Sequence, residues 1–187
     1  MTNKPAYVLG INAYDHDASA CLLRNGELGW AIAKERITRE KHDGGFYKEP
    51  VEYCLNAEGV SIDDIDLVVR NCYILPPTEM ERRMLHQPLR YFTPDESCKP
   101  ADYPKFFKDV PVEYVSHHLA HAYSAFAPSP FEEGVVMVVD GVGSYRSDVT
   151  EPVPRTDIAT PLARESESYY SFSGSRIETL KKVWMEP

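Results

Sequence analysis

The sequence is poor in cysteine and has no excess of positive charge. Its cysteines are far apart and form no C-x-x-C pair: Cys21, Cys54, Cys72 and Cys98. This pattern argues against a zinc ribbon or a disulfide framework and is typical of a reducing compartment. The formal net charge of -9 argues against non-specific binding to nucleic acid or to an anionic membrane, because both need a basic surface. We therefore expect no nucleic-acid partner.

Long apolar runs are also missing. No run approaches the roughly 18 residues that a membrane helix needs, and the first residues, Met1-Thr2-Asn3-Lys4-Pro5, carry no apolar signal core. We expect a soluble, cytoplasmic protein without a membrane partner. With 187 residues, the chain is long enough to bury a sizeable hydrophobic core.

Three short apolar runs open the chain, and we interpret them as strands. They span residues 7–11, 18–23 and 28–33. Asn25-Gly26 is a strong two-residue hairpin signal between the second and the third run, so these strands should form an antiparallel meander.

A helix and a further strand follow the meander. Residues 49–59 have the pattern of a helix that ends at Gly59, and the β-branched run 67–69 indicates a central strand. A strand–helix–strand step requires a parallel crossover, so the sequence predicts a mixed sheet of the α/β class. Prolines interrupt the pattern over residues 76–111, where interleaved aromatic residues favour an ordered excursion.

Two polar segments in this first part of the chain carry possible binding groups. The turn 12–17 is rich in Asn, Asp and His, which is compatible with a plain turn or with ligand contact. The mixed-charge segment 35–45 ends in glycines. It is either a solvated loop or a clamp for an anionic substrate.

The second part of the chain brings two histidines and an aspartate into a regular pattern. If residues 116–127 form a helix, His117 and His121 project from one face, whereas His118 lies about 100° away. A buried strand over residues 135–139 then delivers Asp140 into a Gly-rich turn. These three side chains could form a nitrogen and oxygen site for a divalent metal. The other interpretation is a surface histidine cluster beside an ordinary turn.

The remaining residues indicate one more short strand and a second hairpin. Residues 111–115 form the short strand, and residues 167–172 and 176–184 flank a turn at Ser173-Gly174-Ser175. An apolar strand at the end of the chain suggests a domain that further polypeptide completes.

Six short motifs resemble, in order along nearly the whole chain, the N-terminal part of the O-carbamoyltransferases that modify nodulation factors, cephalosporins, aminoglycosides and ansamycins. They are GIN at 10–12, HDASA at 16–20, ER at 35–36, KHDGG at 41–45, HHLAHA at 117–122 and DGVG at 140–143. The resemblance implies a Kae1-like domain of the actin/sugar kinase/Hsp70 (ribonuclease H-like) α/β architecture. In that architecture two lobes, each a mixed sheet with flanking helices, hold a nucleotide between them.

The resemblance also implies a reaction. A second, YrdC-like domain makes carbamoyl-adenylate from carbamoyl phosphate and ATP, and the Kae1-like domain transfers the carbamoyl group to a hydroxyl of a small-molecule acceptor. His117 and His121 would be ligands of a divalent metal such as Fe2+, with Asp140 as the carboxylate ligand. His16 would be the general base on the acceptor hydroxyl, a role that suits imidazole.

The resemblance further implies contacts to the substrates. Arg39 and Lys41 would contact the carbamoyl or phosphate group, and Asn12 would bind the substrate or the nucleotide. Gly141 and Gly143 would let the backbone approach the nucleotide phosphates. The metal would act as a Lewis acid on a carbamoyl or phosphoryl oxygen.

Members of that family are several times longer than this chain. We therefore expect residues 1–130 to form the first lobe and residues 131–187 the opening strands of an incomplete second lobe, without the YrdC-like domain. A missing ligand would weaken metal binding, and the chain alone should not complete the reaction.

Two other functions stay open at this point. The chain could be a non-catalytic, nucleotide-binding or partner-completed member of the same fold. It could also be a subunit for tRNA threonylcarbamoyl transfer, although its acidic charge counts against RNA binding.

Overall fold

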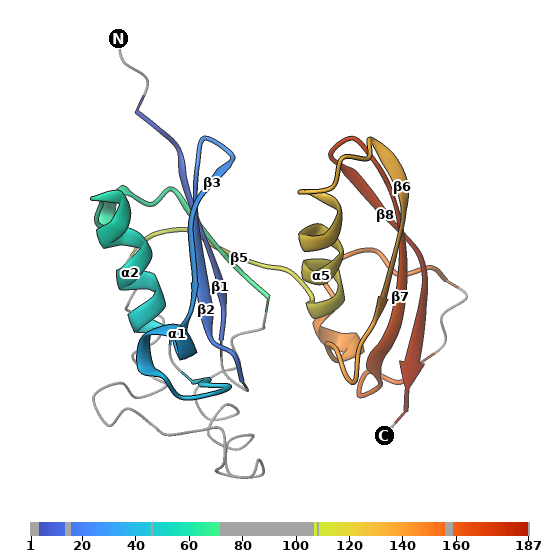
Figure 1. Cartoon of the computed structure of the whole chain (residues 1–187). Coiled ribbons are helices and arrows are strands. Elements are labelled where there is room, and N and C mark those ends of the chain that lie inside the picture. Colours follow the sequence, from blue (N-terminus) through green and yellow to red (C-terminus); the bar gives the residue numbers. More distant parts are fainter. Residues whose placement is uncertain are drawn as a thin grey trace. The chain divides into compact units, whose positions relative to one another are not determined.

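The computed structural model describes residues 4–13, 16–45, 47–71, 107, 109–155 and 159–186. The chain divides into two compact units, the second of which starts its continuous part at Tyr114. Figure 1 traces both units along the sequence. Most of the proline-rich stretch 76–111, which the sequence predicts to be an ordered excursion, lies outside the described residues.

The first unit is built on a five-stranded sheet in the order β3-β2-β1-β4-β5. Its strands are β1 (Tyr7–Asn12), β2 (Ser19–Arg24), β3 (Glu27–Ala33), β4 (Leu67–Arg70) and β5 (Val112–Tyr114). The meander β1-β2-β3 is antiparallel, and β4 pairs with β1 in parallel. Leu9 of β1 lies between Leu22 and Val68 in this register. The predicted mixed sheet is confirmed.

The turn between β2 and β3 has the conformation that its sequence predicts. Asn25 and Gly26 have φ angles of 52° and 84°, which is the requirement of a type I′ turn. The Asn25 side chain also accepts a hydrogen bond of 2.9 Å from the backbone N–H of Ala6. This bond ties the turn to the residue just before β1.

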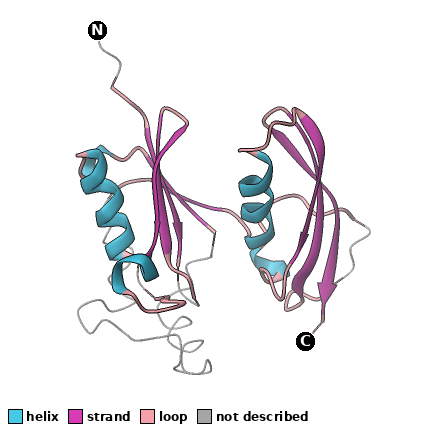
Figure 2. Cartoon of the chain, viewed as in Figure 1, coloured by secondary structure: helices cyan, strands magenta, loops and turns pink. Residues whose placement is uncertain are grey.

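Two helices cover one face of this sheet, as Figure 2 shows: α1 (Lys34–Thr38) and α2 (Lys48–Glu58). Helix α2 ends at Gly59, whose φ of 76° is the left-handed C-cap that glycine favours. The core between α2 and the strands contains Val51, Cys54 and the central strand residues. Segment 35–45, which the sequence left as a possible solvated loop, begins as α1. A 3-10 turn, η1 (Ile62–Asp64), follows α2 and carries a capping box.

The second unit is a helix on an antiparallel sheet in the order β6-β7-β8. Its elements are α5 (His117–Phe126), β6 (Glu133–Val139), the 3-10 turn η4 (Arg146–Asp148), β7 (Arg164–Ser173) and β8 (Arg176–Met185). The helix packs on β6 and β7, with Leu119, Ala122, Val138 and Tyr170 in the core. The Phe126 and Phe172 rings stack with their centroids 4.9 Å apart.

Strand β6 differs from the buried strand that the sequence predicts. Val135, Met137 and Val139 are 65%, 60% and 63% exposed. The physical reason is that β6 lies at the end of the described sheet order, and α5 covers the face that carries Val138. A continuous apolar run therefore does not mean burial on both faces here.

The boundary between the compact units lies before α5, whereas the sequence placed the lobe boundary after residue 130. The reason is that α5 packs on the sheet formed by β6 and β7. None of the helices in the described part of the chain combines the length and apolarity that a bilayer crossing requires.

Candidate metal centre

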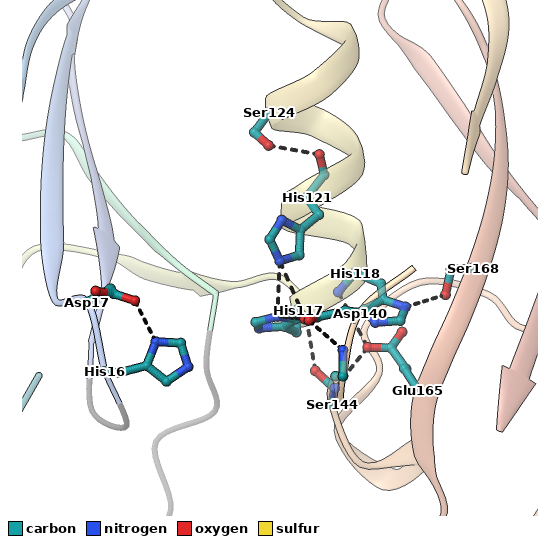
Figure 3. Close-up of polar contacts among 12 residues, drawn as sticks. His16, Asp17, His117, His118, His121, Ser124, Asp140, Ser144, Glu165 and Ser168 are labelled. Atoms are coloured by element: carbon teal, nitrogen blue, oxygen red, sulfur yellow. Dashed lines mark hydrogen bonds and ion pairs between the residues drawn. The ribbon is translucent and has the colours of Figure 1, made fainter. Parts of the chain in front are cut away.

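Helix α5 and the end of β6 bring two imidazoles and a carboxylate together, as Figure 3 shows. His117 and His121 lie four residues apart on α5, so the helical repeat places them on one face. Asp140 follows the last residue of β6 directly. Its Oδ2 lies 2.7 Å from Nε2 of His117 and 3.7 Å from Nε2 of His121. The two Nε2 atoms are 3.1 Å apart.

The charges in this cluster favour the protonation states that a metal requires. Burial lowers the pKa of the His121 imidazole, and the neighbouring His117 lowers it further. Burial alone would raise the pKa of Asp140, but hydrogen bonds from His117 and from the N–H of Gly141 outweigh it, and the net pKa is lowered. Neutral imidazole and ionised carboxylate are the forms that bind metals.

The three donor atoms fit a single cation. Ligand atoms that share one cation at about 2.1 Å lie about 3 Å from one another, and the observed separations scatter around that distance. Two imidazoles with one carboxylate are a donor set found around non-haem Fe2+ and also suit other first-row divalent ions. The side chains are partly exposed, which leaves room for further ligands.

The polar turn 12–17, which joins β1 to β2 and is called the hairpin tip below, belongs to the first unit. Asp17, with a φ of 54°, accepts hydrogen bonds on both oxygens: Nδ1 of His16 is 2.8 Å from Oδ2, and Nδ1 of His42 is 3.0 Å from Oδ1. Burial would raise the pKa of Asp17, but these two histidines lower it overall. Asn12 donates a 2.8 Å hydrogen bond to the backbone oxygen of Asp17. Asn12 therefore holds the tip.

Asp17 also belongs to a second group of possible ligands. Its carboxylate, the Glu35 carboxylate and the His42 imidazole offer donor atoms within 4.8 Å of one another. Glu35 accepts a hydrogen bond of 3.1 Å from the backbone N–H of His42. Asp17, Glu35 and His42 are therefore joined to one another by hydrogen bonds.

The mixed-charge segment places its predicted cations at the surface. Arg39 and Lys41 are both exposed. The buried cation is Lys34, which the sequence analysis did not single out. Its Nζ lies 3.3 Å from Asp43 and donates a 3.2 Å hydrogen bond to the backbone oxygen of Gly44.

The two predicted phosphate-contact glycines differ in their surroundings. A Cβ on Gly141 would meet nothing within 4 Å, whereas a Cβ on Gly143 would lie 2.7 Å from the His118 ring and 2.8 Å from the Cβ of Glu165. Gly143 is thus required for packing within its own unit, apart from any approach to a nucleotide.

A buried polar network lies next to the cluster, and the sequence analysis missed it. Lys182 is fully buried and contacts Glu165 and Glu151 at the same time, with 2.5 Å between its Nζ and Oε1 of Glu151. It also donates a 2.9 Å hydrogen bond to the hydroxyl of Tyr170. Burial raises the pKa of Tyr170, so this hydroxyl stays neutral. The fully buried His118 faces Ser168, with Nδ1 2.8 Å from its Oγ.

No local signal marks Lys182 as buried. Lys182 follows Lys181 in a strand, where successive side chains point to opposite faces of the sheet. This alternation predicts that one of the two lysines faces solvent, but it does not predict which one. The register between β7 and β8 shifts between Tyr169 and Tyr170. A register shift of this kind depends on how the two strands pair and not on the local sequence of either strand.

A family model described as carbamoyltransferase N-terminus matches residues 7–88. An uncharacterised protein of Synechocystis sp., sll1178, is 34% identical in an alignment of 167 positions that covers 74% of this chain and 26% of that protein. Nodulation protein NolNO of Sinorhizobium fredii is 31% identical over 163 residues, covering 84% of this chain and 24% of its own length. The chain thus spans about a quarter of the length of these relatives.

Solved structures agree on the fold. YeaZ from Pseudomonas aeruginosa matches 97% of this chain and 68% of its own chain, with a TM-score of 0.51 and 14% identity. At 14% sequence identity, this structural similarity supports a shared fold and nothing further. It agrees with the expected α/β fold class.

Proposed function

We propose that this chain, whose residues 7–88 match a family model described as carbamoyltransferase N-terminus, is the N-terminal part of an ATP-dependent O-carbamoyltransferase. Its reaction moves a carbamoyl group from carbamoyl-adenylate to a hydroxyl of a small molecule, in the biosynthesis of an antibiotic or another secondary metabolite. The observation that carries the proposal is the convergence of His117, His121 and Asp140 on one point.

The three converging side chains would hold a divalent cation, with Fe2+ as the first candidate. When bound, the cation supplies Lewis-acid polarisation of a carbamoyl or phosphoryl oxygen. The lowered pKa values of His121 and Asp140 favour the neutral imidazole and the ionised carboxylate, the charge states that bind a metal.

His16 is the proposed general base. Where its Nδ1–H donates to Asp17 Oδ2, its Nε2 carries no hydrogen and can accept one. The acceptor hydroxyl gives its proton to Nε2 while its oxygen bonds to the carbamoyl carbon. The bond from that carbon to the adenylate oxygen breaks, and AMP leaves. Asp17 orients the ring, and Asn12 holds the backbone of Asp17 in place.

Metal binding by the chain tests this proposal most directly. We expect the purified chain to bind about one Fe2+ or Co2+ per molecule, measured by anaerobic titration and metal analysis. His117→Ala should lose this metal, because two donors remain where three converged. His16→Ala is the matched control, since it removes an exposed imidazole outside the cluster and should keep the metal.

Two results would count against the proposal. A wild-type chain that binds no metal, with an unchanged His117→Ala fold, would favour the non-catalytic alternative. Turnover of supplied carbamoyl-adenylate by the 187-residue chain alone would contradict the expectation that the reaction needs the remaining length found in the relatives.

A further inference from the structure

The first turn of α5 is capped by groups from elsewhere in the second unit. Ser116, the N-cap residue, makes no side-chain cap hydrogen bond. Instead, the backbone N–H of His117 donates to Oγ of Ser144 at 2.9 Å, and that of His118 donates to Oε2 of Glu165 at 3.4 Å. These N–H groups have no partner within a helix, and a carboxylate is favourable at this positive helix end.

The same carboxylate oxygen also holds the loop that follows Asp140. The backbone N–H of Ser144 donates to Oε2 of Glu165 at 2.9 Å. The main chains are joined as well: Gly143 N–H donates to the oxygen of Glu165 at 2.8 Å, and Glu165 N–H donates to the oxygen of Ser144 at 3.0 Å. One side chain on β7 therefore bonds to both segments that carry the converging donors.

The position of this carboxylate is set by a buried cation. The second oxygen of Glu165, Oε1, contacts Nζ of Lys182, and both side chains are fully buried. A buried charge is costly without a partner, so removing one member strongly favours rearrangement of the other. Lys182 thus holds one oxygen of Glu165 and leaves the other for the two backbone N–H groups.

We propose that Glu165 is the positioning residue of the metal centre: it fixes the start of α5 against the Asp140 loop and so sets the spacing of the donor atoms. This inference rests on the proposed metal function. Partners that orient metal ligands without touching the metal commonly contribute 10–100-fold to affinity.

The test compares two buried glutamates that share Lys182. Glu165→Gln preserves size, but an amide cannot present acceptors both to the Lys182 ammonium and to the N–H of Ser144. Glu151→Gln is the control, because Glu151 contacts Lys182, Ser116 and Tyr170 but not the Asp140 loop. Co2+ affinity is measured by the visible absorption of the bound ion, and stability by urea unfolding.

We expect Glu165→Gln to weaken Co2+ binding about tenfold or more, and Glu151→Gln to change it by less than about threefold at a comparable loss of stability. Unchanged affinity in Glu165→Gln, or an equal loss in Glu151→Gln, would overturn the proposal.

A second measurement separates this inference from the metal function. In the metal-free chain, NMR shifts of the His117 and His121 imidazole nitrogens report their contacts with Asp140. We expect Glu165→Gln to move these resonances and Glu151→Gln to leave them in place. A wild-type chain without Co2+ binding would end the metal proposal, whereas unmoved resonances in Glu165→Gln would end the positioning proposal.

Discussion

At the scale of single residues, Gly141 and Gly143, which follow Asp140, lie in different surroundings. Gly143 packs so closely against His118 and Glu165 that a methyl group there would lie under 3 Å from both. Gly141 faces open space. Neither is among the glycines with positive φ, so the difference is one of packing and not of backbone conformation. The His118 ring and the Glu165 stem are both fully buried and have little room to move.

We predict that Gly143→Ala lowers the free energy of unfolding by about 1–3 kcal/mol, the usual cost of overpacking. Gly141→Ala should change it by about 0.5 kcal/mol or less. Urea unfolding followed by tryptophan fluorescence and circular dichroism measures both. Equal effects of the two substitutions would show that the packing around His118 yields more easily than the contacts indicate.

At the scale of elements, α5 and α2 differ in how the free backbone groups at their ends are hydrogen-bonded. Helix α5 depends on Ser144 and Glu165 for its first turn, and its position is thereby coupled to the strand that carries Glu165. Helix α2 ends by a local device, in which Gly59 N–H donates to the backbone oxygens of Leu55 and Asn56. One helix is thus capped by distant groups and the other by its own sequence.

Replacing Gly59 tests the local device. A Cβ there would meet nothing within 4 Å, but the φ of 76° disfavours a side chain. We expect Gly59→Ala to destabilise the first unit by about 1 kcal/mol. Gly29→Ala in β3 is the control, because its Cβ would make ordinary contacts of 3.5 Å with the Leu22 oxygen and 3.8 Å with Oε2 of Glu58. A neutral Gly59→Ala would mean that α2 can end in another way, visible as altered amide shifts around residue 59.

At the scale of the whole molecule, each compact unit has its own apolar core. The converging donors and the Lys182 network all belong to the second unit, and the His16 tip belongs to the first. The proposed metal ligands and the proposed general base therefore belong to different units of the chain. The relatives that this chain matches are about four times longer.

Core truncation in the first unit tests this assignment. Leu9 is fully buried, and Leu9→Ala should cost about 2–5 kcal/mol of stability. We expect the Co2+ affinity of the folded protein to stay within about twofold of wild type, because every proposed donor lies in the second unit. Titration at low temperature measures the affinity. A large loss under conditions where circular dichroism shows the second unit intact would mean that the metal site needs the first unit.

The sequence by itself determined the local features of this protein. Asn25-Gly26, the Gly59 stop and the four-residue spacing of His117 and His121 act through backbone torsions and helical periodicity, which neighbouring residues control. These features could be predicted for that reason. The polar residues of the first hairpin were also visible, although their bonding through Asp17 was not.

Which distant groups meet depends on how the helices and strands pack against one another. Asp140 reaches the histidines because α5 packs on β6, and Gly143 is needed because His118 and Glu165 are its neighbours. Lys182 is buried in contact with Glu151 and Glu165. Each of these contacts joins segments that are separated along the chain, and its energy depends on burial and on charges that no short stretch of sequence contains. The exposed face of β6 also depends on contacts between distant segments. The apolar run shows only that these residues can be buried, and the packing of α5 determines which of them are buried.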